Sequence, residues 1–144
     1  MNIDPRLAEV DDSLYRVALR ALIINRGRVL LVKEFDGGGW WAIPGGGVDY
    51  GETAKACLVR EIEEELGVSP EFVKCDFKIA HYDIGKVVNG VPRMNIYFKA
   101  TVPEKEIEPT PHVKEWAWFS KKEFLDLNLN PSYDKTEIST IAFS

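Results

Sequence analysis

The stretch 43–68 reads IPGGGVDYGETAKACLVREIEEELGV and joins a glycine-rich loop to the clearest helix of the chain. Its part from 53 to 66 is rich in Ala, Glu and Leu and contains no internal Gly or Pro, a composition that favours helix. Gly67 follows at the place where helices commonly end in a left-handed residue. The stretch therefore predicts a helix over 53–66 that begins directly after a flexible loop.

The acidic residues of this helix gather on one side of it. Four glutamates lie within five residues, at positions 61, 63, 64 and 65. At about 100° per residue, Glu61, Glu64 and Glu65 share an arc of roughly 100°, whereas Glu63 points elsewhere. The adjacent apolar stripe is expected to face the core and consists of Leu58, Ile62 and Leu66.

Carboxylates held this close repel one another unless a cation lies among them. Hard divalent ions with oxygen ligands, such as Mg²⁺ or Mn²⁺, are the natural partners. A solvated acidic helix face is the alternative interpretation. The loop at 43–47 favours a metal site, because a glycine backbone can approach a ligand closely and feeds directly into the helix.

The spacing in this stretch resembles a known motif. The Nudix box is matched at every defined position. Gly46 is followed by five residues and then Glu52, and Glu52 is followed by seven residues and then REIEEELGV over 60–68. The lead-in WAIPG at 41–45 is similar as well. The chain is thereby identified as a member of the Nudix hydrolase superfamily. The resemblance implies an α/β (α+β) sandwich, with a mixed β-sheet between helices, and one domain over 1–144.

The resemblance also implies roles for the residues of the box. Mg²⁺, or Mn²⁺ in its place, would be held by one main-chain carbonyl and three carboxylates, those of Gly45, Glu61, Glu64 and Glu65. Glu61 or Glu64 would instead deprotonate the attacking water, unless the base comes from a loop outside the box. Arg60 and Glu52 would pin the carboxylates in position.

The implied reaction is hydrolysis of a nucleoside diphosphate linked to another group X. The leading expectation is a nucleoside triphosphate, including a damaged or non-standard one, that is cleaved to the monophosphate and pyrophosphate. Nucleotide sugars, ADP-ribose and dinucleoside polyphosphates are alternatives. A non-catalytic nucleotide-sensing Nudix module is the alternative from another class.

Residues outside the box would decide the substrate, and each also has a purely structural interpretation. Five aromatic residues could either stack on a base or pack in the core. They are Trp40, Trp116, Trp118, Tyr82 and Tyr97. His81 is expected to be a core histidine. His112 is a candidate for substrate contact and Arg93 for clamping a phosphate, and an ordinary surface position is the alternative for each. Four further glutamates could be extra metal ligands or bases, or they could simply be solvated surface residues. They are Glu104, Glu106, Glu108 and Glu115.

The remaining sequence predicts strands around the central helix. Strands are expected over 14–24 and 29–32 as a hairpin, over 77–82 and 94–100 with one buried face each, and over 115–119. Loops are expected at 35–39 and 102–112, and residues 1–12 form a loose arm. Ser120 and Glu123 predict a capping box for a short C-terminal helix.

The composition excludes several classes of protein. The chain has 144 residues, 45% hydrophobic and 28% charged, which is typical of a globular protein. The net charge of −5 argues against a grip on a nucleic acid duplex. Two cysteines, Cys57 and Cys75, are too few for a disulfide framework. With no apolar run near ~20 residues and no signal-like start, we expect a cytoplasmic monomer or homodimer without membrane contact.

Overall fold

The computed structural model describes residues 4–7, 9–10, 12–35 and 38–144. Its strands are β1 (Arg16–Asn25), β2 (Arg28–Glu34), β3 (Gly45–Gly47), β4 (His81–Val88), β5 (Val91–Ala100) and β6 (Val113–Phe119). Its α-helices are α1 (Ala54–Leu66), α2 (Lys121–Asp126) and α3 (Lys135–Ala142), with short 3₁₀ turns at Pro5–Leu7, Pro70–Phe72 and Glu104–Glu106. The expected arm over 1–12 and the expected loop over 35–39 each lie partly outside the described residues. No helix in the described ranges is long and apolar enough to cross a membrane.

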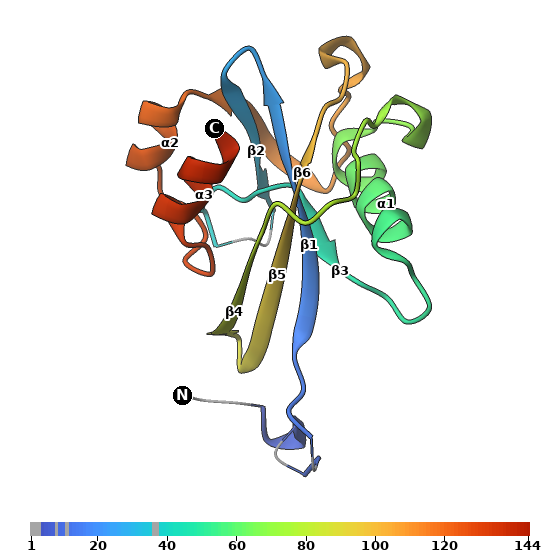
Figure 1. The fold of residues 1–144 in the computed structure, drawn as a ribbon, viewed down its shortest axis with the longest axis vertical. Coiled ribbons are helices and arrows are strands. Elements are labelled where there is room, and N and C mark those ends of the chain that lie inside the picture. The colour runs from blue at the N-terminus through green and yellow to red at the C-terminus, as the bar shows by residue number, and fades with distance from the viewer. Residues whose placement is uncertain (1–3, 8, 11, 36–37) are drawn as a thin grey trace.

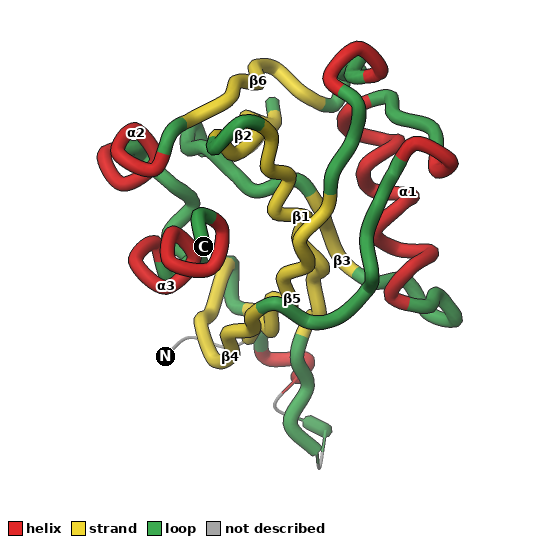
Figure 2. The backbone as a smooth tube through the Cα atoms, turned by 45° about the horizontal axis from the view of Figure 1, so that its top comes forward, coloured by secondary structure: helices red, strands yellow, loops and turns green. Residues whose placement is uncertain are grey.

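The strands form one mixed sheet between two helical layers, as predicted. Their order is β4-β5-β1-β2-β6, with β3 paired to β1 off this path. β1 runs parallel to β5 and antiparallel to both β2 and β3. Helix α1 covers one face of the sheet, while α2 and α3 lie on the other (Figure 1, Figure 2).

The central strand β1 positions the glycine-rich loop. Its end forms the predicted hairpin with β2 through a tight turn in which Arg26 has φ 51° and Gly27 has φ 73°. Its middle pairs with β3, where Arg20 lies opposite Gly45. The loop that leads into α1 is therefore fixed to the middle of the sheet by main-chain pairing.

Helix α1 confirms the sequence prediction at both ends. The Thr53 side chain accepts a hydrogen bond from the amide of Ala56, and Gly67 ends the helix with φ 67°. The predicted apolar stripe is fully buried: Leu58, Ile62 and Leu66. Burying side chains of this size stabilises the fold by roughly 1.5–3 kcal/mol each, which holds the acidic side of α1 at a fixed place beside the sheet.

The strand predicted over 77–82 is wrong in its first part. β4 begins at His81 and runs on to Val88. Phe77 has φ 56°, and the Asp76 side chain accepts a hydrogen bond from the amide of Lys78. This local turn breaks the extended backbone, and Ile79 is 59% exposed instead of facing the core.

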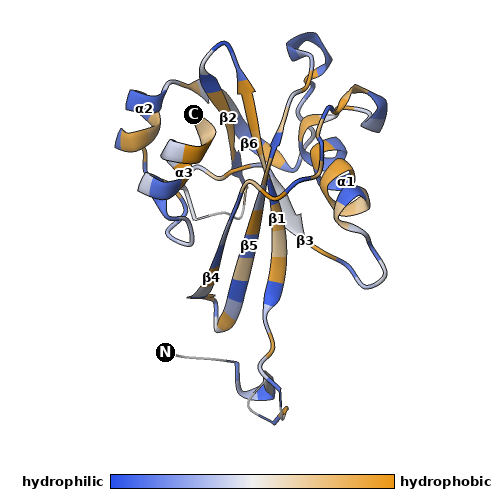
Figure 3. Ribbon diagram, in the orientation of Figure 1, coloured by the Kyte–Doolittle hydropathy of each residue, from blue (hydrophilic) through white to orange (hydrophobic). Residues whose placement is uncertain are grey.

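The expectation of one buried face for β5 is also wrong. Phe98 and Ala100 are buried as expected, but so are Asn95 and Tyr97 on the opposite face. Bands of opposite hydropathy alternate along this strand (Figure 3). Both faces of β5 are therefore covered, and the face that carries Asn95 and Tyr97 is the polar one.

The second face is covered by the C-terminal helices. The capping box predicted at Ser120 and Glu123 is present at the start of α2. Helix α3 was not predicted; Asp134 caps it, and Ile138 is fully buried. Tyr133, which precedes it, is also buried, so the segment between α2 and α3 packs onto the sheet.

Candidate active site

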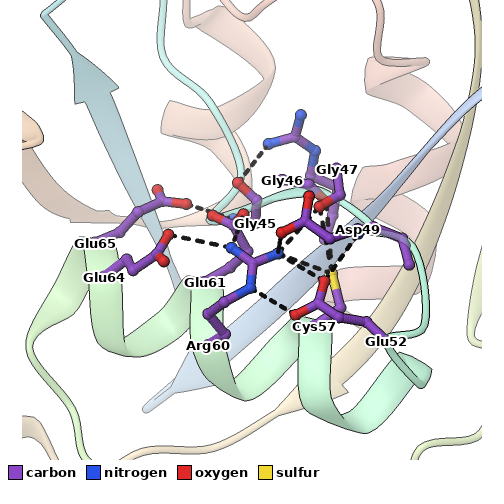
Figure 4. A network of polar contacts seen from close by, with 12 residues as sticks. Gly45, Gly46, Gly47, Asp49, Glu52, Cys57, Arg60, Glu61, Glu64 and Glu65 are labelled. Atoms are coloured by element: carbon purple, nitrogen blue, oxygen red, sulfur yellow. Dashed lines mark hydrogen bonds and ion pairs between the residues drawn. The ribbon is translucent and has the colours of Figure 1, made fainter.

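Arg60 is the centre of a dense network of ion pairs on α1 (Figure 4). Its Nε and Nη2 donate to the two carboxylate oxygens of Glu52 at 2.6 and 2.8 Å. Its Nη1 donates to Glu61 at 2.9 Å and to Glu64 at 3.2 Å. Its Nη2 also reaches the carbonyl of Gly47 at 3.2 Å. One guanidinium therefore links the loop to two glutamates of the helix.

Glu52 forms the fixed end of this network. Hydrogen bonds from Arg60, followed by one from the amide of Asp49, lower the pKa of Glu52 to about 2. The paired Arg60–Glu52 contact is bidentate, the strongest geometry for these two groups. The arrangement agrees with the expectation that both residues hold the neighbouring carboxylates in place.

Glu65 differs from the other acidic residues because it is buried. Only 5% of its surface is exposed. Its Oε1 accepts a hydrogen bond from the amide of Gly45 at 2.9 Å, whereas Oε2 has no hydrogen-bond partner among the described residues. Burial raises the pKa of Glu65 well above its usual range. A buried, unpartnered carboxylate oxygen is costly unless a cation or proton supplies its partner.

The carboxylates of α1 do not converge on one position where they could hold an ion together. Among the described residues, no three His, Cys, Asp or Glu side chains are placed to hold one ion. Arg60 draws Glu61 and Glu64 to one side, and Gly45 binds Glu65 on the other. The donor set is nevertheless all oxygen and strongly acidic, which fits Mg²⁺ or Mn²⁺. Together with the unpartnered oxygen of Glu65, it makes the site suitable for a divalent cation.

The glycines of the loop are required by close packing. Gly45 has φ 145°, and a β-carbon there would collide with the carbonyl of Leu19. A β-carbon at Gly46 would collide with the carboxylate of Glu61. The loop can therefore lie directly against the acidic side of α1 only because it lacks side chains.

A cavity of about 370 Å³ opens over these carboxylates. Its lining consists of Glu34, Phe35, Glu61, Glu64, Glu65, Pro111 and His112. Glu34 and Phe35 come from the end of β2 and Pro111 and His112 from the loop before β6, so segments far apart in sequence meet here. The cavity gives a substrate direct access to the acidic side of α1.

The loop at 102–112 is bonded to the end of α1. The amides of Glu108 and Thr110 donate to the carbonyls of Leu66 and Glu65 at 2.8 and 3.1 Å. The Thr110 hydroxyl donates to the carbonyl of Glu64. These bonds satisfy carbonyls that a helix end leaves free, and they place His112 at the cavity, where substrate contact was expected.

Comparisons with known proteins decide the family. The family model for the NUDIX domain matches residues 14–137. The chain belongs to the Nudix family. It is 30% identical over 132 residues to the nucleoside triphosphatase NudI of Escherichia coli strain K12, covering 84% of this chain and 93% of NudI. Hydrolysis is thus the activity of this Nudix protein, and members of the family act on small nucleotides and generally use divalent cations.

Solved structures show the same fold. A MutT protein from Methanosarcina mazei Go1 matches with a TM-score of 0.74 and 24% identity, over 88% of this chain and 92% of that one. A C. elegans Ap4A hydrolase matches with a TM-score of 0.72 and 19% identity, again over 88% and 92%. These likenesses confirm the Nudix fold.

The aromatic candidates of this Nudix hydrolase lie in three settings: beside the site, in the core and, for Tyr82 and Trp116, on the exposed surface. Trp40 lines a small cavity of about 40 Å³ together with Arg20, Glu34, Ala42 and Asn130. Because Glu34 also lines the larger cavity, Trp40 lies beside the acidic site. Tyr97 is fully buried, so its use as an exposed stacking surface is wrong.

The other candidates lie away from the larger cavity. Its lining includes none of Trp116, Trp118, Tyr82, Arg93, Glu104, Glu106, Glu108 and Glu115. Glu115 forms an ion pair with Lys33 at 3.7 Å. His81 is partly buried and stacks on Tyr97 with ring centroids 5.7 Å apart, in agreement with a structural role.

Sequence reasoning missed Glu34, Phe35 and Arg20. Arg20 donates from Nη1 to the carbonyls of Ile43 and Gly45 at 3.1 and 3.2 Å. The signal for Arg20 was a charged residue in the middle of an apolar strand, which is rare without a partner. Glu34 and Phe35 had no local signal, because their position depends on the pairing of β2 with β6.

Proposed function

We propose that this Nudix hydrolase is a Mg²⁺-dependent pyrophosphohydrolase that cleaves a nucleoside triphosphate to the monophosphate and pyrophosphate. The buried, unpartnered Oε2 of Glu65 is the observation on which the proposal rests. Glu65 lines an acidic cavity of about 370 Å³ that is large enough for a pyrophosphate group. The similarity to a relative named as a nucleoside triphosphatase supports the choice of substrate.

Four groups of the chain are available to the cation: the carbonyl of Gly45 and the carboxylates of Glu61, Glu64 and Glu65. Either Glu61 or Glu64 would serve as the base instead of a ligand. A bound dication neutralises phosphate charge, lowers the pKa of bound water and orients an in-line displacement. Gly45 and Glu65 are already joined by a hydrogen bond at 2.9 Å, so these two ligands would move together with the loop.

The proton of the attacking water would pass to Glu61 or Glu64. Burial raises the pKa of Glu61, and this makes it a stronger base than an exposed glutamate. Glu64 has half of its side chain exposed at the cavity and contacts Arg60 only at 3.2 Å. It can therefore leave Arg60 and reach a water, so we assign the base role to Glu64 and a ligand role to Glu61.

A substrate panel tests the proposal. We would measure kcat/KM for deoxynucleoside triphosphates, nucleotide sugars, ADP-ribose and dinucleoside polyphosphates with Mg²⁺ and with Mn²⁺. Triphosphates should be cleaved fastest, and pyrophosphate should appear as a product. Faster cleavage of another class would replace the substrate, and no cleavage of any compound would favour a nucleotide-sensing module.

Helix α1 provides a matched pair of variants for the same assay. Glu64→Gln removes a carboxylate from the cavity, whereas Glu63→Gln removes one from an exposed position outside it. Glu64→Gln should reduce kcat by roughly 10²- to 10⁴-fold, the usual contribution of a general base. Equal activity of the two variants would contradict the base role of Glu64.

The proposal also covers the cellular compartment and the oligomeric state of the enzyme. Both cysteines are free, and burial raises the pKa of the Cys57 thiol to about 11 and also raises that of Cys75. Such thiols agree with a reducing, cytoplasmic environment. A monomer or homodimer is expected, and sedimentation of the purified chain would distinguish the two.

A further inference from the structure

Glu34 adds a carboxylate from outside α1 to the lining of the acidic cavity. The other carboxylates of that lining belong to the helix, whereas Glu34 is the last residue of β2. Its side chain is exposed, and it also lines the smaller cavity beside Arg20. The end of a strand therefore brings a further negative charge to a place that is already strongly acidic.

A bulge in the pairing of β2 with β6 decides what Glu34 faces. Lys33 lies opposite Glu115, and a regular antiparallel register would then place Glu34 opposite Lys114. Instead, Glu34 lies opposite Val113, so Lys114 is the extra residue of the bulge. Opposite charges attract across paired strands. The bulge thus removes the ammonium group that would otherwise neutralise Glu34.

No other cation of the described structure takes the place of Lys114. Among the described residues, the carboxylate of Glu34 forms no ion pair. Arg60 pairs with Glu61 and Glu64 on the helix. A carboxylate held beside others of the same charge is costly unless a cation lies among them, so Glu34 adds to the demand of this cavity for positive charge.

Glu65 is in the same condition as Glu34, because Arg60 does not bind it either. Glu65 is 5% exposed, and its buried Oε2 has no hydrogen-bond partner in the described part of the chain. Burial is the main cause of the raised pKa of Glu65, and the negative charge of Glu34 adds to it. The two carboxylates are therefore close enough to repel each other, and a cation between them would stabilise both.

We propose that Glu34 is a further ligand of the divalent cation and acts together with Glu65 when the phosphates of the substrate arrive. The inference rests on the proposed metal-dependent hydrolysis and adds to it a ligand from outside the Nudix box. Mg²⁺ is usually bound by one or two carboxylates, with phosphate oxygens and waters completing its octahedral shell. Two carboxylates are thus a sufficient contribution from the protein, and no convergence of three described side chains on one ion is needed.

Binding of Mn²⁺ to the intact protein tests the proposal without relying on turnover. We would titrate Mn²⁺ by electron paramagnetic resonance, with and without an α,β-imido nucleoside triphosphate, which resists cleavage. With this analogue, Glu34→Gln should weaken Mn²⁺ binding by roughly 10- to 100-fold, since even residues that only support metal ligands have effects of this size. Glu115→Gln removes the same charge from the neighbouring strand and should bind Mn²⁺ like the wild type.

The two ways in which this experiment can fail are distinct. Equal Mn²⁺ affinity of Glu34→Gln and the wild type would overturn the role of Glu34 and leave the proposed function standing. A wild-type protein that binds no Mn²⁺, with or without the analogue, would overturn the proposed function itself. Because Glu34 is exposed, its variants should fold, and circular dichroism verifies this.

Two further substitutions separate direct ligation from a long-range effect of charge. Glu34→Asp keeps the charge but withdraws the oxygens, so Mn²⁺ binding should weaken several-fold, at high salt as well as at low salt. Glu34→Cys offers a soft thiolate, so its affinity for Cd²⁺ relative to Mg²⁺ should rise above that of Glu34→Ser. Wild-type affinity in Glu34→Asp, or equal metal preference of the Cys and Ser variants, would contradict direct ligation.

Discussion

Arg60 and Arg20 lie on either side of the same glycine-rich loop, but their surroundings differ. Arg60 contacts Glu52, Glu61 and Glu64 and the carbonyl of Gly47. Arg20 bonds only two carbonyls, those of Ile43 and Gly45, and its buried Nε has no partner among the described residues. Arg60 therefore fixes carboxylate side chains, whereas Arg20 fixes main-chain carbonyls of the loop. The two sides of the loop differ in what they hold: one positions acidic side chains, and the other anchors the loop to the sheet.

The largest effect is expected for Glu65→Gln, which lies between the two regions. The change removes the buried carboxylate that Gly45 binds, and the fold should remain because Gln is nearly isosteric. Turnover should fall by roughly two orders of magnitude or more, since even residues that only support metal ligands cost 10- to 100-fold. The measurement is kcat at saturating Mg²⁺, with Glu63→Gln as the control and circular dichroism to verify folding. Normal turnover would remove Glu65 from the site.

Arg60→Lys tests the side of the loop that positions carboxylates. An ammonium group cannot bridge Glu52, Glu61 and Glu64 at once. Activity at fixed Mg²⁺ should fall about 10- to 100-fold, and the Mg²⁺ concentration for half-maximal rate should rise. KM for the nucleotide at saturating Mg²⁺ should change less than this Mg²⁺ requirement. An unchanged Mg²⁺ requirement would contradict the positioning role of Arg60.

Arg20→Lys tests the other side with the same substitution. The charge remains, but an ammonium group does not reproduce the guanidinium that bonds the carbonyls of both Ile43 and Gly45. Because these bonds anchor the loop, Arg20→Lys should lower the Tm of the protein. Its Mg²⁺ concentration for half-maximal rate should rise less than that of Arg60→Lys. An unchanged Tm would contradict the anchoring role of Arg20.

The smallest effect concerns stability in acid. The pKa of Glu52 is about 2 in the folded chain and 4.5 in its ordinary state. Its pairing with Arg60 therefore stabilises the fold fully above pH 4.5, and this contribution is lost as the pH falls from 4.5 towards 2. Urea unfolding should show Glu52→Gln to be less stable than the wild type at pH 6, with the difference shrinking at pH 3. In an Arg60→Met background, the same change should have little effect at either pH.

The sequence was sufficient for features that depend on neighbouring residues. Helix α1, its end at Gly67 and the hairpin turn at Arg26 follow from local patterns, and the structure confirms them. Thr53, predicted as the first helical residue, is the N-cap instead. The acidic arc was also predicted correctly, because helical spacing fixes which side chains share a side.

The errors arise where a distant segment decides the result. β4 starts late because Phe77 adopts a left-handed backbone that no composition rule predicts for an aromatic residue. Helix α3, KTEISTIA, contains several β-branched residues and forms because it packs on the sheet. Arg20 lies opposite Tyr97 only through the parallel pairing of β1 with β5, so this neighbourhood could not be read from spacing.

The bonds from Glu108 and Thr110 to the last turn of α1 have a consequence for dynamics. A surface loop rich in proline and glutamate, such as 102–112, would ordinarily show rapid hydrogen exchange of its amides. Here those two amides donate to carbonyls in the last turn of α1, so they should exchange only when the end of the helix itself opens. Inserting even one residue beside Glu108 or Thr110 would then disturb Glu64 and Glu65 directly, although the insertion would lie more than forty positions away in the chain.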